Sequence, residues 1–135
     1  DTLETATLWD NVPRMVERIE AALHEALADE GERSHVFTHL SHVYPQGASI
    51  YTTYLYRQAK EPDETLRRWA ALKGAASRAI VECGGTISHQ HGVGRDHAPY
   101  LAAEKGALGL DALADVARRF DPDGRMNPGV LLADG

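Results

Sequence analysis

The chain has 135 residues, 43% hydrophobic and 25% charged, which is the size and composition of one ordinary globular domain. Its 14 Lys and Arg residues against 20 Asp and Glu give a net charge of -6, which argues against nucleic acid as a partner. No apolar run approaches the ~20 residues of a transmembrane segment, and no targeting pattern opens the chain.

Two further features concern the redox environment of the protein and whether the chain is a fragment. Cys83 is the only cysteine, so no disulfide can form within the chain, and its apolar helical surroundings are typical of a small buried hydrophobe. These observations predict a reducing, cytoplasmic setting. The chain begins at Asp1 rather than at a methionine, which predicts a fragment of a longer protein.

The first predicted helix begins at Asp10 or Asn11 as its cap, with Pro13 in its first turn. Apolar residues recur along one face at spacings of three and four, which is the pattern of an amphipathic helix. They are Val12, Met15, Val16, Ile19, Leu23, Ala26 and Leu27. Gly31 is expected to end the helix in a left-handed cap.

Residues 35–44 and 48–57 predict an antiparallel hairpin, because both are rich in β-branched and aromatic residues and Tyr44-Pro45-Gln46-Gly47 between them favours a turn. Of the first strand's histidines, only His35 and His39 are expected to share a face, and surface or packing roles are expected for all of them. In the second strand Tyr51 shares a polar face with Ser49 and Thr53, which makes it a candidate acid or base. Half-buried packing in the sheet is the alternative.

A second helix is predicted to open at Pro62 and to stop at Gly84-Gly85. A short strand over 86–89 and a last helix over roughly 110–120 follow, and the apolar tail 125–131 is expected to dock on another surface. This order predicts an α+β fold, in which helices pack on one face of a small antiparallel sheet, as a single domain over 1–135.

The stretch from 84 to 95 carries the densest set of chemically capable side chains. On a strand His89 and His91 share one face and Gln90 takes the other, while Arg95 offers a forked cation for a phosphate or carboxylate. Three interpretations stay open: a ligand-facing site in which the imidazoles move protons, polar histidines at a sheet edge, and a metal site. We expect no metal, because zinc needs three or four ligands and no Cys or Glu is spaced to complete the set.

The segments GGTISHQHGVG (84–94) and FDPDGRMNPG (120–129) resemble the C-terminal domain of FAD-linked oxidases of the vanillyl-alcohol oxidase type. The opening ETATLW (4–9) also looks like part of that family's substrate domain. The resemblance implies FAD as cofactor, a separate N-terminal FAD-binding domain as partner, and a cap role for this chain over the flavin and the substrate. It implies an enzyme at full length and an inactive fragment in isolation, and it leaves a homodimer open.

Two branches of the family are similar in different ways. YPQGASIY (44–51) resembles alkyldihydroxyacetonephosphate synthases, in which the tyrosine matched by Tyr51 acts in proton transfer and three consecutive histidines stand where this chain has His89-Gln90-His91. D-2-hydroxyacid dehydrogenases of the D-lactate and glycolate type place metal-binding histidines along the strand that holds Tyr44 and Tyr51, and a glutamate at Gln90. Gln90 is neither acid nor base, so it separates this chain from both branches.

Pattern and resemblance together predict a role for each candidate residue. The predicted catalytic residues are Tyr51, His89 and His91; the predicted cofactor contacts are His89, His91, Gly92 and Asn127; the predicted substrate contacts are Gln90, Arg57 and Arg95. The predicted activity is FAD-dependent oxidoreduction of a small hydroxy acid or of a phosphorylated hydroxy or keto compound. The alternatives are alkyl transfer of the synthase type and a non-catalytic ligand-binding or dimerisation module.

Overall fold

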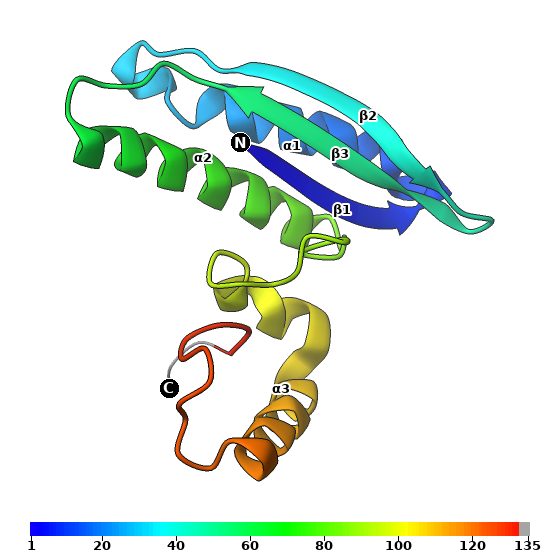
Figure 1. Ribbon diagram of the computed structural model, residues 1–135. Helices are drawn as coiled ribbons and strands as arrows, with labels where there is room; N and C mark the ends of the chain where they lie inside the picture. The colour runs from blue at the N-terminus through cyan, green and yellow to red at the C-terminus, as the bar shows by residue number, and fades with distance from the viewer. Residues whose placement is uncertain (133–135) are drawn as a thin grey trace.

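The computed structural model describes residues 1–132, and Figure 1 shows its elements in chain order. The strands are β1 (Thr2–Leu8), β2 (His35–Val43) and β3 (Gly47–Leu55), and the helices are α1 (Val12–Glu25), α2 (Pro62–Glu82) and α3 (Leu101–Phe120). Short 3-10 turns cover Trp9–Asn11, Ala28–Glu30 and Ala98–Tyr100. Within residues 1–132, none of the helices combines the length and apolar character that crossing a membrane requires.

The three strands form one antiparallel sheet in the order β1-β3-β2. Strand β3 lies in the middle because it pairs with β2 through the hairpin turn and with β1 along its other edge. The β1 register runs from Thr2 opposite Thr53 to Leu8 opposite Gly47. A residue on β1 therefore faces the same side of the sheet as its partner on β3.

Helices α1 and α2 pack side by side on one face of the sheet, and this interface is the core of the molecule (Figure 1). Met15, Ile19 and Leu23 of α1 recur every four residues and are fully buried against Ile50 and Tyr54 of β3. Each such aliphatic side chain contributes about 1.5–3 kcal/mol on burial. The predicted α+β fold, with helices on one face of a small antiparallel sheet, is confirmed.

The helix boundaries differ from the prediction at two places. Helix α1 ends at Glu25, and Gly31 ends the following 3-10 turn instead, with a φ of 67°. Helix α3 begins at Leu101 rather than near 110, and Gly106 breaks its regular conformation with a φ of 66°. The sequence did not predict a helix over 101–109, because Gly106 and Gly109 are normally unfavourable inside a helix.

The predicted strand over 86–89 is wrong, and β1 was not predicted at all. Residues 86–89 form an irregular segment that still pairs with β1, since Thr86 N donates to Ala6 O at 3.1 Å and His89 N donates to Glu4 O at 3.0 Å. Gly85 admits this close approach, because a Cβ there would lie 2.6 Å from Thr5 Oγ1 of β1. The irregular segment extends the sheet's β1 edge and brings the predicted histidines against Glu4.

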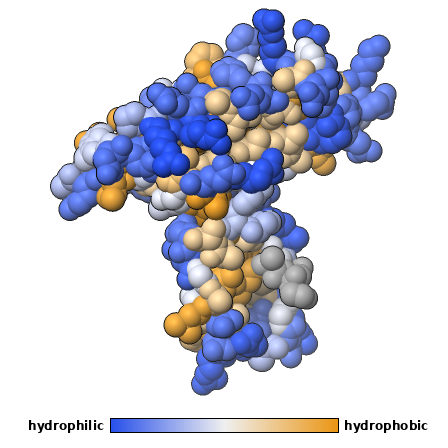
Figure 2. All heavy atoms as spheres, turned by 180° about the vertical axis from the view of Figure 1, so that it is seen from behind, coloured by the Kyte–Doolittle hydropathy of each residue, from blue (hydrophilic) through white to orange (hydrophobic). Residues whose placement is uncertain are grey.

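Helix α3 and the tail lie beyond the layer of sheet and helices (Figure 1). The tail folds back toward the loop before α3, because Leu131 N donates to Gly94 O at 3.1 Å and Arg95 donates to Pro128 O at 2.8 Å. A hollow of about 810 Å³ lies between α3 and the tail. A separate groove of about 590 Å³ lies beside α2. Figure 2 shows hydrophobic side chains gathered over this lower part of the molecule. The exposed ones include Leu108, Val116, Phe120 and Met126.

Candidate functional site

The candidate site lies on the face of the sheet opposite the helices. Glu4 of β1, Tyr51 of β3 and His39 of β2 are register partners, so their side chains form a row across this face. The loop after α2 adds two imidazoles over the row. We call the whole group the histidine cluster; its members are Glu4, His39, His42, Tyr44, Tyr51, His89 and His91.

Glu4 is the centre of the histidine cluster. It is only 4% exposed, and its Oε1 accepts a hydrogen bond from Ser41 Oγ while lying 3.3 Å from Nδ1 of both His42 and His89. Its second oxygen, Oε2, lies 3.2 Å from Nε2 of His91. One buried carboxylate therefore orients three imidazoles that come from β2 and from the loop after α2.

The charge state of Glu4 follows from competing effects. Burial acts to raise the pKa of its carboxyl group, but hydrogen bonds from Ser41, Ser49, His42 and His89 outweigh burial and hold that pKa below its ordinary value. Glu4 is therefore ionised at neutral pH. An ionised carboxylate only accepts hydrogen bonds, which fixes the direction of every bond it makes in the histidine cluster.

A β-bulge in β2 places His42 in the histidine cluster. Leu40 pairs with Ile50 and the next pair is His42 with Ser49, so Ser41 is the extra residue. The expectation that His42 faces away from His39 is therefore wrong, because strict alternation fails at the bulge. Ser49 stabilises the bulge by accepting a hydrogen bond from His42 N at 2.8 Å.

The aromatic members of the histidine cluster pack against its imidazoles. The Tyr51 ring stacks on His39 with centroids 5.2 Å apart and meets the edge of His91 at 5.5 Å. Tyr44 lies at the hairpin turn, and its hydroxyl is 3.1 Å from Nε2 of His89. The Tyr44 hydroxyl thus lies beside an imidazole nitrogen that can exchange a proton with it, whereas Tyr51 contacts its two imidazoles through its ring.

The structure gathers some of the predicted site residues and separates others. Tyr51, His89 and His91 come together, although His89 and His91 do so through Glu4 and not through a shared strand face. Gln90, between them, is exposed with a φ of 59°. Gly92 follows with a φ of 72°, and a Cβ there would meet no atom within 4 Å.

The remaining three predicted residues lie outside the histidine cluster. Arg57 follows the far end of β3, where its Nε is 3.9 Å from Glu32. Arg95 donates to Pro128 O and so connects the loop to the tail, in which Asn127 is exposed with a φ of 48°. The predicted cofactor and substrate contacts of these residues stay predictions.

The sequence interpretation missed Glu4, His42 and Tyr44. Glu4 belongs to a strand whose partners are distant in sequence, and His42 depends on a bulge that alternation does not reveal. Tyr44 belongs to the predicted turn, and it meets His89 only because the segment 86–89 pairs with β1. The usable signal for Glu4 was the β-branched Thr2, Thr5 and Thr7 around it, because β-branched residues favour a strand.

The histidine cluster also contains a ligand set suited to a metal. One ligand atom each from Glu4, His42 and His89 lie within 4.8 Å of one another, and zinc accepts such a set. Glu4 is the ligand that the spacing argument against a metal did not include. Within residues 1–132 every buried side-chain N or O atom has a hydrogen-bond partner, so the network is complete as hydrogen bonds alone.

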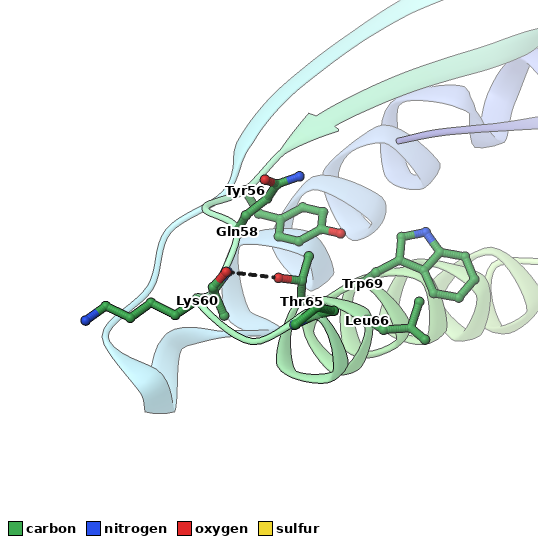
Figure 3. Close-up of a pocket in the computed structure, with 8 residues that line it drawn as sticks. Tyr56, Gln58, Lys60, Thr65, Leu66 and Trp69 are labelled. Atoms are coloured by element: carbon green, nitrogen blue, oxygen red, sulfur yellow. Dashed lines mark hydrogen bonds between the residues drawn. The ribbon is translucent and has the colours of Figure 1, made fainter.

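A separate groove of about 590 Å³ lies at the opposite end of β3, between the chain after Leu55 and the start of α2 (Figure 3). Tyr56, Leu66 and Trp69 supply its apolar lining. Thr65 Oγ1 accepts from Ala59 N at 2.9 Å and closes the turn that precedes α2. The groove contains no group of residues comparable in chemistry to the histidine cluster.

Comparison with known proteins identifies the family. Residues 1–131 match the family described as FAD linked oxidases, C-terminal domain. The alkyldihydroxyacetonephosphate synthase of Trypanosoma brucei brucei is 30% identical over 132 residues, which is 98% of this chain and 21% of that protein. Glycolate oxidase subunit GlcD of Bacillus subtilis (strain 168) is 43% identical over 74 residues, 55% of this chain and 16% of that protein.

Solved structures agree with this result at the level of the fold. A structure of alkyldihydroxyacetonephosphate synthase matches with a TM-score of 0.58 at 17% identity, over 95% of this chain and 20% of that one. Nearly all of this chain matches the Trypanosoma brucei brucei synthase, but the chain spans only about a fifth of that synthase's length. Because the family match extends over residues 1–131, the chain belongs to the FAD-linked oxidases, as their C-terminal domain.

Proposed function

We propose that this chain is the substrate-covering part of an FAD-dependent oxidoreductase that acts on a small hydroxy acid or on a phosphorylated hydroxy or keto compound. The observation that carries the proposal is the histidine cluster, which lies on the sheet face that none of the helices within residues 1–132 covers. A structural role alone does not require a buried carboxylate under three imidazoles, because burying that charge costs free energy unless every partner is in place.

The described residues fit one part of FAD, its ring, better than the whole cofactor. Imidazole and phenol groups offer hydrogen bonds to a flat heteroaromatic ring, and the open backbone at Gly92 leaves room for close approach. The sequence contains no G-x-G-x-x-G phosphate loop, so the diphosphate needs another domain. When bound, FAD supplies the acceptor for two electrons.

Tyr51 is the proposed acid or base toward the substrate. Its ring is held between His39 and His91, so the phenol has a defined position on the uncovered face. Oxidation of a hydroxyl carbon requires a base for the hydroxyl proton, and a positioned side chain typically contributes 10²–10⁴-fold to such a step. Arg95 is the proposed contact for an anionic substrate group.

An N-terminal FAD-binding domain is the proposed partner of the apolar surface on α3 and the tail. Leu108, Val116, Phe120 and Met126 are exposed there, in a region that Figure 2 shows as hydrophobic. Large exposed apolar patches mark interaction sites on proteins. Arg95, in the loop that carries His89 and His91, donates a hydrogen bond to Pro128 O in the tail. This bond connects the loop to the apolar surface.

The test is a flavin spectrum of the full-length protein, mixed without oxygen with a panel of D-2-hydroxy acids. We expect one acid to bleach the flavin, and Tyr51→Phe to slow bleaching about 10²- to 10⁴-fold with the flavin still bound. Tyr56→Phe is the matched control, because Tyr56 stacks on Tyr54 outside the histidine cluster. Equal rates for Tyr51→Phe and the wild type would remove Tyr51 from the mechanism.

Alkyl transfer of the synthase type is the second candidate, and it is favoured by the similarity to a synthase over 98% of the chain. It predicts a flavin that no hydroxy acid bleaches, together with turnover of an acyl-dihydroxyacetone phosphate and a long-chain alcohol. A full-length protein without flavin would contradict both chemistries and support a non-catalytic binding module.

A further inference from the structure

We propose that Glu104, in the first turn of α3, is a positioning residue for the histidine cluster. Its carboxylate holds the backbone at Ile87, two residues before His89, and so determines where His89 and His91 stand. The consequence for catalysis rests on the proposed function, in which these imidazoles face the flavin ring. The positional effect depends only on contacts within the chain and has a measurement of its own.

Strand β1 holds the segment 86–89 at two of its amides. Thr86 N donates to Ala6 O at 3.1 Å. His89 N donates to Glu4 O at 3.0 Å. A regular antiparallel strand exchanges bonds with its partner at every second residue, whereas these two donors stand three positions apart. The backbone between them therefore leaves the ladder, and β1 does not fix the direction in which the loop continues.

Glu104 supplies an acceptor to the amide that lies between these two donors. Ile87 N donates to Glu104 Oε2 at 2.9 Å, across 17 positions of the chain. Ile87 is only 2% exposed, so its amide does not readily turn to water. A buried amide without a partner costs free energy, and the chain avoids that cost by staying within reach of the carboxylate. The bond therefore fixes Ile87, and with it the start of the turn that carries the two histidines.

The first turn of α3 gives Glu104 a fixed place. Leu101, at the start of that turn, is 2% exposed and anchors it to the rest of the molecule. The second carboxylate oxygen, Oε1, lies 2.6 Å from Lys105 Nζ, so the two oxygens have different partners. Gly106 follows with a φ of 66° and interrupts the regular helix, so this turn has a direction of its own. The place of Glu104 is thus set by the turn and not by the apolar surface farther along α3.

A different set of contacts holds the far side of the loop. Ser88 Oγ donates to Gly92 O at 2.7 Å. His97 Nδ1 lies 3.3 Å from Gly92 O and 3.1 Å from Val93 O, and it donates because carbonyl oxygens only accept. The two histidines of the loop that join the cluster lie between an end held by Glu104 and an end held by Ser88 and His97. Loss of the Glu104 contact should therefore move these two histidines and leave His97 in place.

The imidazoles have little room for movement before their contacts are lost. His89 Nδ1 lies 3.3 Å from Glu4 Oε1, and His91 Nε2 lies 3.2 Å from Glu4 Oε2. Because a hydrogen bond requires a distance below about 3.5 Å, a shift of roughly 0.5 Å breaks either contact. A misplacement of about 1 Å can cost roughly 10²-fold in the rate of an enzymatic step. The Ile87 bond therefore bears on the reaction, although Glu104 does not touch the reacting atoms.

Three substitutions of Glu104 and one of its neighbour separate positioning from general stability. Glu104→Ala removes the acceptor, and Glu104→Asp shortens its reach by one methylene group while keeping the charge. Glu104→Gln keeps a carbonyl oxygen that can accept from Ile87 N. Lys105→Ala is the matched control, because it removes the ion pair with Oε1 and leaves the Ile87 bond.

The first experiment follows the 135-residue chain by NMR. Glu104→Ala should speed exchange of the Ile87 amide hydrogen at least about 10-fold, because its acceptor is lost. The same variant should shift the imidazole resonances of His89 and His91. The resonances of His24, on the exposed side of α1, should not move. Glu104→Asp should give changes of the same kind, and it decides by the same criteria if the alanine variant does not fold.

Two matched variants should behave like the wild type in these spectra. They are Glu104→Gln, which keeps the acceptor, and Lys105→Ala, which keeps the whole carboxylate. Exchange of the Ile87 amide at the wild-type rate in Glu104→Ala overturns the proposal. Imidazole shifts as large at His24 as at His89 also overturn it, because they indicate general loosening of the chain.

The second experiment measures flavin bleaching by the full-length protein with the substrate found above. Glu104→Ala should lower the limiting rate about 10- to 10²-fold, with the half-saturating substrate concentration and the flavin content unchanged. Glu104→Gln should restore the rate, and Lys105→Ala should keep it. Bleaching by Glu104→Ala at the wild-type rate overturns the role in catalysis and leaves the proposed function intact. A wild-type flavin that no substrate bleaches or turns over refutes the proposed function instead, and exchange of the Ile87 amide still decides the positional effect.

Discussion

Glu4 shows at the scale of one residue how a buried charge can be stable. Its carboxylate has lost nearly all contact with water, and hydroxyl and imidazole groups replace that contact. Because its pKa is lowered in the folded chain, ionised Glu4 contributes stability that is complete above its ordinary pKa. That contribution is lost as the pH falls through the lowered value.

We therefore expect Glu4→Gln to lower the free energy of unfolding by about 1–3 kcal/mol at neutral pH, because hydrogen bonds to a charged group are lost. The difference from the wild type should shrink below the ordinary glutamate pKa of about 4.3, because the unfolded wild-type chain takes up the proton there before the folded chain does. Urea denaturation at both pH values measures it, with exposed Glu17→Gln as the control. A difference that does not depend on pH would contradict this account of Glu4.

Substitution of glycine by alanine is expected to have opposite effects on stability at Gly47 and at Gly74. A Cβ at Gly47 would lie 2.0 Å from the backbone oxygen of Thr7, so Gly47→Ala must separate β1 from β3 and should cost more than about 2 kcal/mol. At Gly74, inside α2, the nearest atom is the flexible end of Arg78 at 3.2 Å. Gly74→Ala should be neutral or should stabilise by up to about 1 kcal/mol. Thermal unfolding of both variants decides, and equal effects would argue against the steric explanation.

At this scale the sequence predicted residue types better than their partners. His89, His91 and Tyr51 stand out because reactive side chains and glycines are concentrated around them. Glu4 is as central to the histidine cluster as any of them, but its partners lie about 40 and 85 positions away along the chain, and local patterns carry no information on such pairs. His42 required a bulge, which alternation does not predict.

At the scale of elements, ion pairs attach the turn after α1 to the beginning of α2. Arg68 Nε is 3.4 Å from Glu30 and from Glu64, and its Nη1 is 3.2 Å from Glu32. Hydrogen bonds from Arg67, aided by Arg68, lower the pKa of the Glu64 carboxyl group to about 2. Asp63 and Glu64 also lie at the positive end of the α2 dipole, which favours the helix start.

Arg68→Ala should lower the free energy of unfolding by about 1 kcal/mol, since a network of pairs is worth more than a single exposed pair. The loss should become smaller in about 1 M salt, where charges are screened beyond ~3 Å. Arg14→Ala, on the exposed side of α1, is the control and should change little. A loss that is the same at low and high salt would point to packing of the Arg68 stem instead.

The elements that were predicted correctly are those with local determinants. The β2–β3 hairpin follows from its turn residues, and α2 follows from Pro62 at its start and Gly84 after its end. Strand β1 is determined by pairing with β3, about 40 to 50 residues away, and the segment 86–89 is determined by pairing with β1, about 80 residues away. Helix α3 contains two glycines in its first half, which made its sequence look like a loop up to Leu110.

At the scale of the whole molecule, two surfaces have no helix or strand of the described residues, 1–132, packed over them. One is the polar face of the sheet with the histidine cluster, and the other is the apolar surface on α3 and the tail (Figures 1 and 2). The hydrogen bond between Arg95 and Pro128 links the two. Their opposite chemistry fits the proposal that one partner domain covers α3 while its cofactor faces the histidine cluster.

Phe120 tests this arrangement because its contribution should depend on the partner. It is 81% exposed, so Phe120→Asp should leave the unfolding temperature of the 135-residue chain nearly unchanged. In the full-length protein the same change places a charge in an apolar interface, and we expect a lower unfolding temperature and faster loss of flavin. Leu66→Asp is the matched control, since Leu66 is 63% exposed in the groove beside α2. If Leu66→Asp releases flavin as readily as Phe120→Asp does, α3 is not the docking surface, and if neither variant does, the domain contact lies elsewhere on the chain.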